Sequence, residues 1–507
     1  MPSPKALEGS SDLSAFLRRL ASKHGDRPAV IGESMALRFS DLDRAASTWA
    51  RKLEVCGFGR GTHVGLLGGN GPRWLAAAFG VWRAGATLVP ISTFVTPREL
   101  GETLSHADVA ALIVQPRLRS IDFMAALQQL PDQKSLPQIL RLDDVSTSSD
   151  LPTTDRSSVD PDSVACILYT SGTTGRPKGV MLTHRSILST VEPTAARTGL
   201  TDDGVLLSSL PLFWVAGLII RALPTLACGC ALALLETFTV DSAIDMMRRI
   251  RPTALHLRPP QVGQILSHPA FTADLLAPVT KGGGRSEWYA PHMSAARLIT
   301  GYGMTEMSGY VTALDWQDSE AARRSELGTL LPGVEARIVA ADGTPCDTGR
   351  PGQIEVRGPG MFAGYYKEAL ETGKTTDGWF VTGDIGTVDA AGHFQFSGRS
   401  KDLLRIKGIN VSPIEVESVL NRHRDVEAAY VVGLPPDGLD QRLVAVLVPK
   451  GDHLDADDVR RHVRAELSHY KQPAEYVVIH RSDVPLSGTS KPQRAVLAEI
   501  AMERSKR

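Results

Sequence analysis

The sequence predicts an α/β protein with a large N-terminal part, built from mostly parallel sheets and helices, and a smaller α+β part at the C-terminus. Strand-like and helix-like segments alternate through the first part, which is typical of parallel strands joined by covering helices. The pattern changes near residue 403, and the remaining hundred or so residues are enough to fold alone. A chain of 507 residues also exceeds the usual size of one hydrophobic core.

The individual elements follow from the periodicity of the apolar residues. Apolar side chains at helical spacing predict a first amphipathic helix around residues 13–20. In the rest of the first part we expect helices at 41–56 and 73–84, and strands at 64–67, 87–91, 109–114, 164–169 and 353–357. Beyond residue 403 we expect helices at 413–421, 455–467 and 493–502, and strands at 428–432, 443–448 and 476–479. Residues 131–163 are polar and rich in Ser, Asp, Thr and Pro, which predicts an exposed connection.

The composition disfavours several classes of protein. The chain is 42% hydrophobic and 22% charged, which is typical of globular proteins, and its net charge of −1 gives no basis for a nucleic-acid partner. Five scattered cysteines favour reduced thiols and a cytoplasmic location, and the N-terminus lacks the pattern of a signal peptide. Residues 212–235 are long and apolar, but Arg221, Pro224 and Gly229 interrupt them. We therefore expect core elements there and no stable membrane insertion.

The strongest motif is a glycine-rich loop that follows the strand expected at 164–169. Residues 169–180 read YTSGTTGRPKGV and combine three glycines with four hydroxyl side chains and Lys178. Glycines let backbone N–H groups turn toward an anion, hydroxyls donate to phosphate oxygens, and a lysine adds positive charge. A plain turn would explain flexibility but not this convergence of groups. The spacing from Gly172 differs from that of the common P-loop, which disfavours kinases and NTPases of that type.

Four further clusters are ordinary when each is taken alone. Residues 301–306 (GYGMTE) contain an aromatic that can stack on a nucleobase, and a threonine and a glutamate that can hold a phosphate oxygen and Mg²⁺. A glycine turn at the surface with an exposed glutamate explains the same residues equally well. Asp384, in the TGD of 382–384, can accept hydrogen bonds from both hydroxyls of a ribose, but the same residues are equally typical of a β-turn. Residues 398–417 (GRSKDLLRIKGINVSPIEVE) mark the start of the second part. Residues 487–494 (SGTSKPQR) present Lys491 in a loop, where a lysine is usually just solvated.

In this order, the five clusters together resemble the adenylate-forming superfamily of acyl-CoA synthetases, firefly luciferases and peptide-synthetase adenylation domains. The resemblance covers essentially the whole chain, and its most specific carriers are YTSGTTGRPKGV and the GRSKD…KG…VxPxEVE block. It implies activation of a small-molecule carboxylic acid by ATP to an acyl-adenylate, with release of pyrophosphate, and then transfer of the acyl group to the thiol of CoA. The implied cofactors are ATP, Mg²⁺ and coenzyme A.

The resemblance also implies a division of the chain. An AMP-binding domain of layered sheets at residues 1–401 would hold the ATP and acyl sites, and a small mobile domain at 402–507 would rotate about a hinge at Asp402. Lys491 is expected to contact the substrate carboxylate and the α-phosphate in the first half-reaction. Rotation is then expected to bring Lys407 and Gly408 to the site, where the CoA thiol attacks the adenylate.

The other implied roles fall on motif residues of the large domain. The β- and γ-phosphates are expected against the glycine-rich loop, at Thr170, Ser171, Gly172, Thr173, Thr174 and Lys178. The remaining nucleotide contacts are expected from Gly283, Gly301, Tyr302 (adenine), Gly303, Thr305 (α-phosphate), Glu306 (Mg²⁺), Asp384 (ribose) and Arg399 (ribose or phosphate).

Two segments bear on the acyl pocket, and one of them departs from the family's common pattern. The family commonly carries PLFH ahead of the pocket, whereas this chain has PLFW at 211–214. Trp214 is bulkier than His and does not titrate near neutral pH. It is either a core aromatic or, together with Gly217, a residue of the acyl pocket. A glycine run at 282–284 follows in the region where the family approaches both nucleotide and acyl group. We expect Gly284 to line the pocket and the run to widen it for a bulky or ring-containing acid.

Several alternatives remain open. An amino-acid-activating domain usually carries an Asp around residues 213–217, and none is present. An adenylation enzyme that loads an acyl carrier protein, or a luciferase-like oxygenase, would share the motifs. A non-catalytic nucleotide or acyl-CoA sensor would be expected to lack Lys491 or the phosphate loop. Serine hydrolases and zinc enzymes are disfavoured, because G-x-S-x-G and H-E-x-x-H are absent. We expect a monomer or a homodimer.

Overall fold

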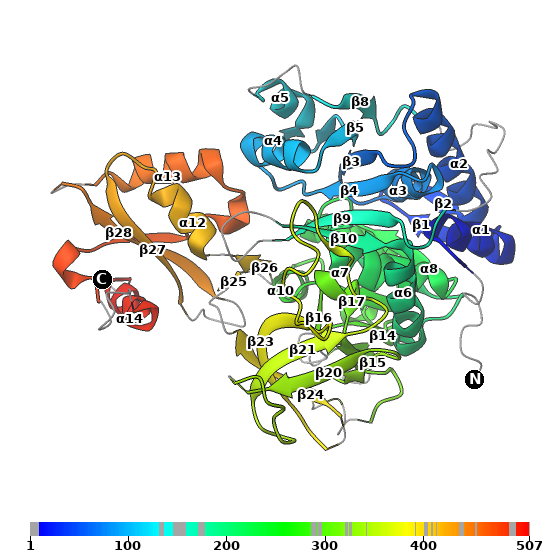
Figure 1. Ribbon diagram of the computed structural model, residues 1–507. Coiled ribbons are helices and arrows are strands. Elements are labelled where there is room, and N and C mark those ends of the chain that lie inside the picture. The colour runs from blue at the N-terminus through cyan, green and yellow to red at the C-terminus, as the bar shows by residue number, and fades with distance from the viewer. Residues whose placement is uncertain are drawn as a thin grey trace.

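Two seven-stranded sheets form the frame of the large domain in the computed structural model (Figure 1). The structure describes residues 10–130, 136–145, 159–170, 178–284, 292, 297–319, 323, 327–340, 342–390, 392–399, 404–406, 409–411, 413–434, 441–451, 454–485 and 493–505. The predicted α/β class is confirmed, because both sheets are mostly parallel and carry helices on their faces.

The first sheet has the strand order β15-β14-β13-β11-β12-β1-β2. All its neighbouring strands are parallel except β1 and β2, which form an antiparallel hairpin. Its strands are β1 (Pro28–Ile31), β2 (Ala36–Arg38), β11 (Val205–Ser208), β12 (Ala231–Leu234), β13 (Ala254–His256), β14 (Lys281–Gly283) and β15 (Arg297–Ile299). The carboxyl ends of β11, β13 and β14 therefore meet at one edge, where ligands bind in open α/β sheets.

The second sheet has the order β22-β10-β9-β4-β3-β5-β8 and contains the strand that leads into the glycine-rich loop. Its strands are β3 (His63–Leu67), β4 (Thr87–Ile91), β5 (Val109–Val114), β8 (Gln138–Arg141), β9 (Val164–Thr170), β10 (Lys178–Thr183) and β22 (Gly364–Tyr365). The prediction that 131–163 is only an exposed connection is wrong for β8. This strand pairs in parallel with β5 and buries Leu140, and Leu142 and Val145 after it are also buried, so a few apolar side chains outweigh the polar surroundings.

Helices and sheets alternate in layers because each strand directs successive side chains to opposite faces. In β11, Leu206 belongs to the core between the two sheets, whereas Leu207 packs on the outer face against α9 and α10. The helices of the large domain are α1 (Leu13–His24), α2 (Phe39–Val55), α3 (Pro72–Arg83), α4 (Pro97–His106), α5 (Phe123–Gln128), α6 (His184–Thr198), α7 (Val215–Gly217), the π-helix η2 (Leu218–Ala222), α8 (Leu223–Ala227), α9 (Val240–Ile250) and α10 (Pro259–Leu266).

Short elements and a small antiparallel sheet complete the large domain. The small sheet has the order β20-β21-β23-β24, with strands β20 (Glu335–Val339), β21 (Gly352–Arg357), β23 (Phe380–Val388) and β24 (Phe394–Arg399). A tight hairpin encloses the 3-10 turn of the GYGMTE motif and consists of β16 (Gly303–Met304), η5 (Thr305–Met307) and β17 (Gly309–Tyr310). The remaining short strands are β6 (Arg117–Leu118), β7 (Ile121–Asp122), β18 (Thr312–Ala313) and β19 (Thr329–Leu330), and the remaining 3-10 turn is η3 (Ala273–Leu275).

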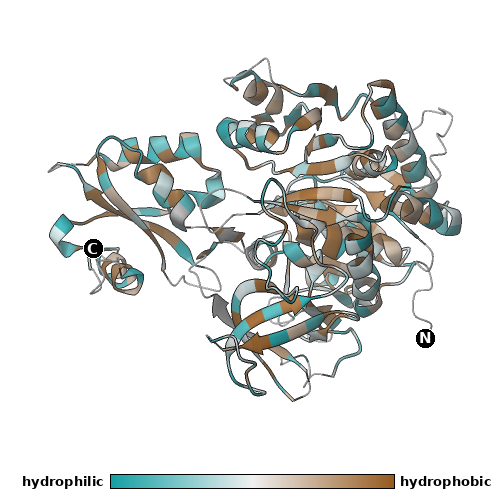
Figure 2. Cartoon of the chain, viewed as in Figure 1, coloured by the Kyte–Doolittle hydropathy of each residue, from teal (hydrophilic) through white to brown (hydrophobic). Residues whose placement is uncertain are grey.

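The C-terminal residues form a separate α+β unit to the left in Figure 1. Its three-stranded sheet, β27-β28-β29, has one core with α12 and α13 on one face and a second core with α14 on the other. The colouring in Figure 2 agrees, since β27 and β28 are largely hydrophobic and α13 is largely hydrophilic. The elements are β25 (Leu404–Ile406), β26 (Ile409–Val411), α12 (Pro413–Leu420), β27 (Val426–Leu434), β28 (Arg442–Pro449), α13 (Ala456–Glu466), η6 (His469–Lys471), β29 (Glu475–Val478), η7 (Arg481–Asp483) and α14 (Arg494–Arg504).

The apolar run at 212–235 divides as the sequence predicts, into α7, η2, α8 and strand β12. In the part of the chain that the structure describes, no helix combines the length and apolarity needed to span a membrane. All five cysteines are unpaired, as expected for reduced thiols, and burial raises the pKa of Cys228 to about 11.

Candidate active site

The glycine-rich loop is anchored by two antiparallel strands, β9 and β10. Thr170 at the end of β9 lies opposite Lys178 at the start of β10, so the intervening residues close a hairpin. The predicted phosphate contacts at Ser171, Gly172, Thr173 and Thr174 fall in that segment and lie outside the described residues. Lys178 is half-buried, and its Nζ lies 3.0 Å from the carboxylate of Glu368.

Tyr365 joins the end of this loop to the GYGMTE motif. The Nζ of Lys178 lies 4.5 Å from the centre of the Tyr365 ring, in a cation–π contact. On its other side, the Tyr365 hydroxyl donates a 2.9 Å hydrogen bond to Glu306. Burial, and then the negative charge of Glu306, raise the pKa of Tyr365 well above its usual range, so the phenol keeps its proton. The predicted phosphate lysine and the predicted Mg²⁺ ligand thus flank one aromatic ring.

A second contact joins the residues predicted for adenine and ribose. The hydroxyl of Tyr302 donates a 2.7 Å hydrogen bond to Asp384, and the Asp384 residue is only 3% exposed. The backbone of Arg399 lies directly opposite Asp384 in the ladder between β23 and β24. The fold therefore brings together three residues that are separated by up to nearly 100 positions in the sequence: Tyr302, Asp384 and Arg399.

The glycines of GYGMTE are required by close backbone contacts. A Cβ on Gly301 would lie 2.1 Å from the carbonyl oxygen of Thr312, and one on Gly303 would lie 2.3 Å from that of Gly309. The hairpin formed by β16 and β17 is therefore too tight for side chains at these positions. It leaves Thr305 half-buried at the start of the η5 turn, beside Glu306.

Trp214 belongs to a group of aromatic rings rather than to the deep core. It is half-buried, and its ring lies 5.6 Å from Phe213 and 6.1 Å from Phe94. Gly217 has a packing reason to be glycine, because a Cβ there would lie 1.9 Å from the carbonyl oxygen of Pro211. A role in the acyl pocket remains a prediction for Trp214, Gly217 and Gly284.

Arg221 and His256 lie beside the glycine run and were not predicted as site residues. Arg221 is 1% exposed; its guanidinium donates to Nδ1 of His256 and, over 3.1 Å, to the hydroxyl of Tyr310. A Cβ on Gly283 would lie 2.4 Å from His256 and 2.7 Å from Arg221. His256 and Arg221 thus occupy the space that a side chain at position 283 would take, and a Cβ on Gly282 would clash with Leu255. Because protein atoms fill the space beside both glycines, the expected widening of the pocket does not occur at these two positions.

The hydrogen-bonded network of Arg221, His256 and Tyr310 connects the carboxyl edge of the first sheet to the GYGMTE hairpin, because Tyr310 pairs with Gly303 in that hairpin. Burial, and then the charge of Arg221, hold the pKa of His256 well below its usual value, so the imidazole is neutral and accepts from the guanidinium. A sequence signal did exist: Arg221 is the only charged residue in the apolar run at 212–235. A buried charge in such a run requires polar partners.

Four predicted residues of the small domain and hinge, Asp402, Lys407, Gly408 and Lys491, lie outside the described residues. Their surroundings are partly described. β25 and β26 pair directly on either side of Lys407 and Gly408, with Ile406 opposite Ile409. Helix α14 begins at Arg494, three residues after Lys491.

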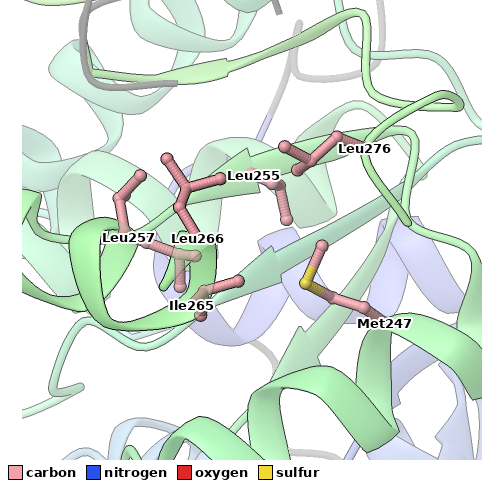
Figure 3. A pocket seen from close by; sticks show the side chains of 7 residues that line it. Met247, Leu255, Leu257, Ile265, Leu266 and Leu276 are labelled. Carbon is pink, nitrogen blue, oxygen red and sulfur yellow. The ribbon is translucent and has the colours of Figure 1, made fainter. Parts of the chain in front are cut away.

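Two hollows lie apart from these residues. Seven apolar side chains, including Met247 and Leu255, line a void beside α9 and α10 that has no room for a water molecule (Figure 3). A more open hollow of about 410 Å³ lies on the small domain among Arg422, His423, Arg424, Asp458 and His462. Arg424 already pairs with Asp458 at 3.1 Å there. Neither hollow contains a residue predicted for catalysis.

Models of known families match both parts of the chain. The model of the AMP-binding enzyme matches residues 17–366, and that of the AMP-binding enzyme C-terminal domain matches residues 415–491. This chain belongs to the AMP-binding enzyme family. Among relatives of this AMP-binding enzyme, a feruloyl-CoA synthase of Amycolatopsis sp is 32% identical, with 91% of this chain and 94% of the relative covered. A sulfoacetate–CoA ligase of Cupriavidus necator is 30% identical, with 96% and 98% covered.

Solved structures agree with this assignment. The amide bond synthetase McbA from Marinactinospora thermotolerans has a TM-score of 0.84 at 27% identity, with 96% of this chain and 99% of that chain covered. A malonyl-CoA ligase with methylmalonyl-CoA and AMP bound has a TM-score of 0.76 at 27% identity, with 91% and 97% covered. ATP-bound MatB from Rhodopseudomonas palustris has a TM-score of 0.66 at 27% identity, with 97% and 99% covered. The chain is thus an enzyme of the AMP-forming acid–CoA ligase family.

Proposed function

We propose that this enzyme activates a carboxylic acid in two steps within one site. In the first, a carboxylate oxygen attacks the α-phosphorus of ATP, a P–O bond forms, and the bond to the leaving pyrophosphate breaks. In the second, the sulfur of CoA attacks the acyl carbon, a thioester forms, and AMP leaves. The observation that supports this best is the pair of contacts Lys178–Tyr365–Glu306 and Tyr302–Asp384, which unite motifs predicted separately for phosphate, metal, adenine and ribose.

The roles of the cationic residues follow from electrostatics. A carboxylate that approaches a triphosphate is one anion meeting another, so the reaction needs positive charge and donors at the developing negative charge. Lys178 would face the leaving pyrophosphate, and Lys491 would contact the carboxylate and α-phosphate together. Glu306 offers a carboxylate of the kind that binds Mg²⁺, and bound Mg²⁺ would neutralise phosphate charge. The residue Glu306 is half-buried, which suits this role.

The division of labour between the domains is part of the proposal. Residues 1–401 would bind ATP and the acid, and residues 402–507 would rotate about Asp402 between the half-reactions. In one arrangement Lys491 would reach the nucleotide, and in the other Lys407 and Gly408 would face it while CoA reacts. A carrier-protein thiol in place of CoA would follow the same chemistry.

A bulky or ring-containing acid is the proposed substrate class. Trp214 stands where the family commonly has histidine and lies in a group of aromatic rings, which suits a flat apolar acyl group. One relative is named for feruloyl-CoA, whose acyl group contains a ring. The small acid in the name of the sulfoacetate ligase makes a useful contrast.

The test is release of pyrophosphate across a panel of carboxylic acids, with and without CoA, followed by mass identification of the products. The panel should contain aromatic, alicyclic, short linear and sulfonated acids. We expect pyrophosphate with a ring-containing acid and a CoA thioester when CoA is present. Adenylate without thioester would point to a carrier protein as acceptor, and exclusive turnover of short linear acids would refute the substrate class. No pyrophosphate with any acid would favour a non-catalytic sensor.

A further inference from the structure

The small domain touches the large domain through a cluster of charged and polar side chains. Ser468 Oγ donates a 2.6 Å hydrogen bond to Glu99 in α4, and Lys471 Nζ lies 3.2 Å from the other oxygen of the same carboxylate. Lys471 also pairs with Glu415 of α12 at 2.6 Å. The side chains of Lys471, Glu99 and Glu415 are 8%, 13% and 11% exposed, so the cluster is largely shielded from water.

Apolar and peripheral contacts surround this cluster. The ring of Tyr470 lies 6.0 Å from that of Phe94, which precedes α4 and also contacts Trp214. Arg98 of α4 forms an ion pair with Glu466 at the end of α13. The contact therefore joins the N-terminal turn of α4 to the segment 466–471 and reaches the aromatic group beside the predicted acyl pocket.

The cluster divides unequally between the domains. Glu99 belongs to the large domain, whereas Lys471 and Glu415 both belong to the small one. Rotation of the small domain would separate Lys471 from Glu99 but leave Lys471 with Glu415. Because a shielded carboxylate that loses its cation is unfavourable unless water replaces it, the Glu99 contact favours the arrangement in which it forms.

Two observations indicate which arrangement this is. The hairpin of β25 and β26, whose paired residues Ile406 and Ile409 flank Lys407 and Gly408, lies on the side of the small domain that faces the large one, whereas helix α14 lies farther from it (Figure 1). The chain also has a higher TM-score with the malonyl-CoA ligase product complex, 0.76, than with MatB, which gives 0.66 both with ATP bound and in the apo form. Both favour the arrangement that follows adenylate formation.

We propose that Glu99 and Lys471, together with Ser468, form an interdomain latch that holds the small domain in position for thioester formation. This inference rests on the proposed two-step function. Glu99 and Lys471 are positioning residues, since neither contacts the motif residues of the nucleotide site in the described part of the chain. The latch raises the population of the arrangement that forms thioester, and the rate of that step follows this population.

The test compares Glu99→Gln with Glu102→Gln. Both changes remove one negative charge from α4, but Glu102 is exposed and pairs with Arg98 one turn away in the same helix. In Glu99→Gln the new amide oxygen can still accept from the backbone N–H of Thr96, so the start of α4 is retained. For Glu99→Gln we expect thioester formation from supplied acyl-adenylate to slow about tenfold, because a charge-assisted contact is lost, while adenylate formation stays within about twofold of wild type. Glu102→Gln should leave both steps unchanged.

A second measurement reads the arrangement without catalysis. Phe94→Cys and Tyr470→Cys, placed together, should be cross-linked by a short bifunctional maleimide, with the linked peptide identified by mass. Adding Glu99→Gln should slow this cross-link, and adding Glu102→Gln should not. Equal cross-linking in the two backgrounds, or equal thioester rates for the two single variants, would overturn the latch. If wild type forms no adenylate with any acid but cross-linking still depends on Glu99, the proposed function fails and the latch stands.

Discussion

At the scale of single residues, the proposed nucleotide site depends on side chains that connect motifs rather than on the motifs alone. Tyr365 separates Lys178 from Glu306 and contacts both, and Tyr302 holds Asp384 by a buried hydrogen bond. Such contacts fix side-chain positions before ATP binds, so less rotational freedom is lost on binding.

Lys491 provides the sharpest residue-level prediction. We expect Lys491→Ala to abolish formation of acyl-adenylate, because the positive charge shared by carboxylate and α-phosphate is lost. Thioester formation from supplied adenylate should survive, since the lysine acts only in the first half-reaction. The measurement is pyrophosphate exchange for the first step and thioester yield for the second. An equal loss of both steps would contradict this role.

Gly283 gives a prediction about close packing. In Gly283→Ala the new Cβ would lie 2.4 Å from His256 and 2.7 Å from Arg221, so the network of Arg221, His256 and Tyr310 must shift. We expect a loss of stability of about 1–3 kcal/mol and adenylate formation slowed at least about tenfold. Gly263→Ala is the matched control, because nothing lies within 4 Å of its Cβ and alanine suits helix α10. A wild-type rate for Gly283→Ala would show that the network does not position the site.

At the scale of elements, the start of helix α6 is attached to α1 by a buried histidine. His184 is 1% exposed, and its Nδ1 accepts a 3.2 Å hydrogen bond from the backbone N–H of Leu13. Burial lowers the pKa of His184 from 6.5 to about 4, although the charges of Asp12 and Asp160 oppose the shift. The folded protein therefore contains the neutral imidazole down to about pH 4.

This depressed pKa makes a signed prediction for stability. Above pH 6.5 both folded and unfolded states hold neutral His184, so its full contribution is present. As the pH falls toward 4, only the unfolded state takes up the proton, and stability falls by up to about 3 kcal/mol. His184→Gln keeps an acceptor for Leu13 and should lose this part of the pH dependence. Urea unfolding of the large domain, followed by tryptophan fluorescence at pH 7 and 4.5, measures it.

Tryptophan fluorescence and a variant at His480 provide the controls for this prediction. All seven tryptophans lie within residues 1–401, so the fluorescence reports the large domain. His480→Gln changes an exposed histidine of the small domain and should retain the wild-type pH dependence. If His184→Gln is destabilised by acid as much as wild type is, His184 is not the group responsible.

The elements that the sequence predicts well are those whose reason is local. The strands at 87–91 and 109–114 have the predicted bounds, because uninterrupted apolar runs of that length are typical of buried strands. β8 was missed because its place depends on pairing with β5, which the polar residues around it conceal.

In the site, the glycine-rich loop and GYGMTE could be found from composition. Tyr365 and His256 could not, since their partners lie up to nearly 190 residues away, and for Arg221 the only signal was its charge within an apolar run.

At the scale of the whole molecule, the proposed function requires that two domains share one reaction and change their relative position between its steps. The contact between α4 and the segment 466–471 fixes one arrangement, and the chain near residue 402 is the predicted pivot. The sequence predicts this pivot only through family resemblance, because a hinge has no periodicity of its own. Asp402 itself lies outside the described residues.

The hinge can be tested by stiffening it. Asp402→Pro fixes φ near −65° and removes a backbone donor, so a rotation that changes this dihedral is blocked. We expect adenylate formation to continue while thioester formation from preformed adenylate stalls. Asp402→Lys is the matched control, because it changes the side chain but leaves φ free and the backbone N–H in place, and it should retain both steps. Thioester formation at the wild-type rate in Asp402→Pro would exclude Asp402 as the hinge.

The strand order of the first sheet has a consequence for how the protein is made. β1 and β2 form a hairpin near the N-terminus, but the other neighbour of β1 in the sheet is β12, which follows roughly 190 residues later. At about 5–20 residues per second, the ribosome needs roughly 10–40 s to deliver that partner. During this interval the hairpin presents an unpaired edge, with Val30 and Ala29 awaiting burial. We expect this segment to be the part of the nascent chain that most needs a chaperone.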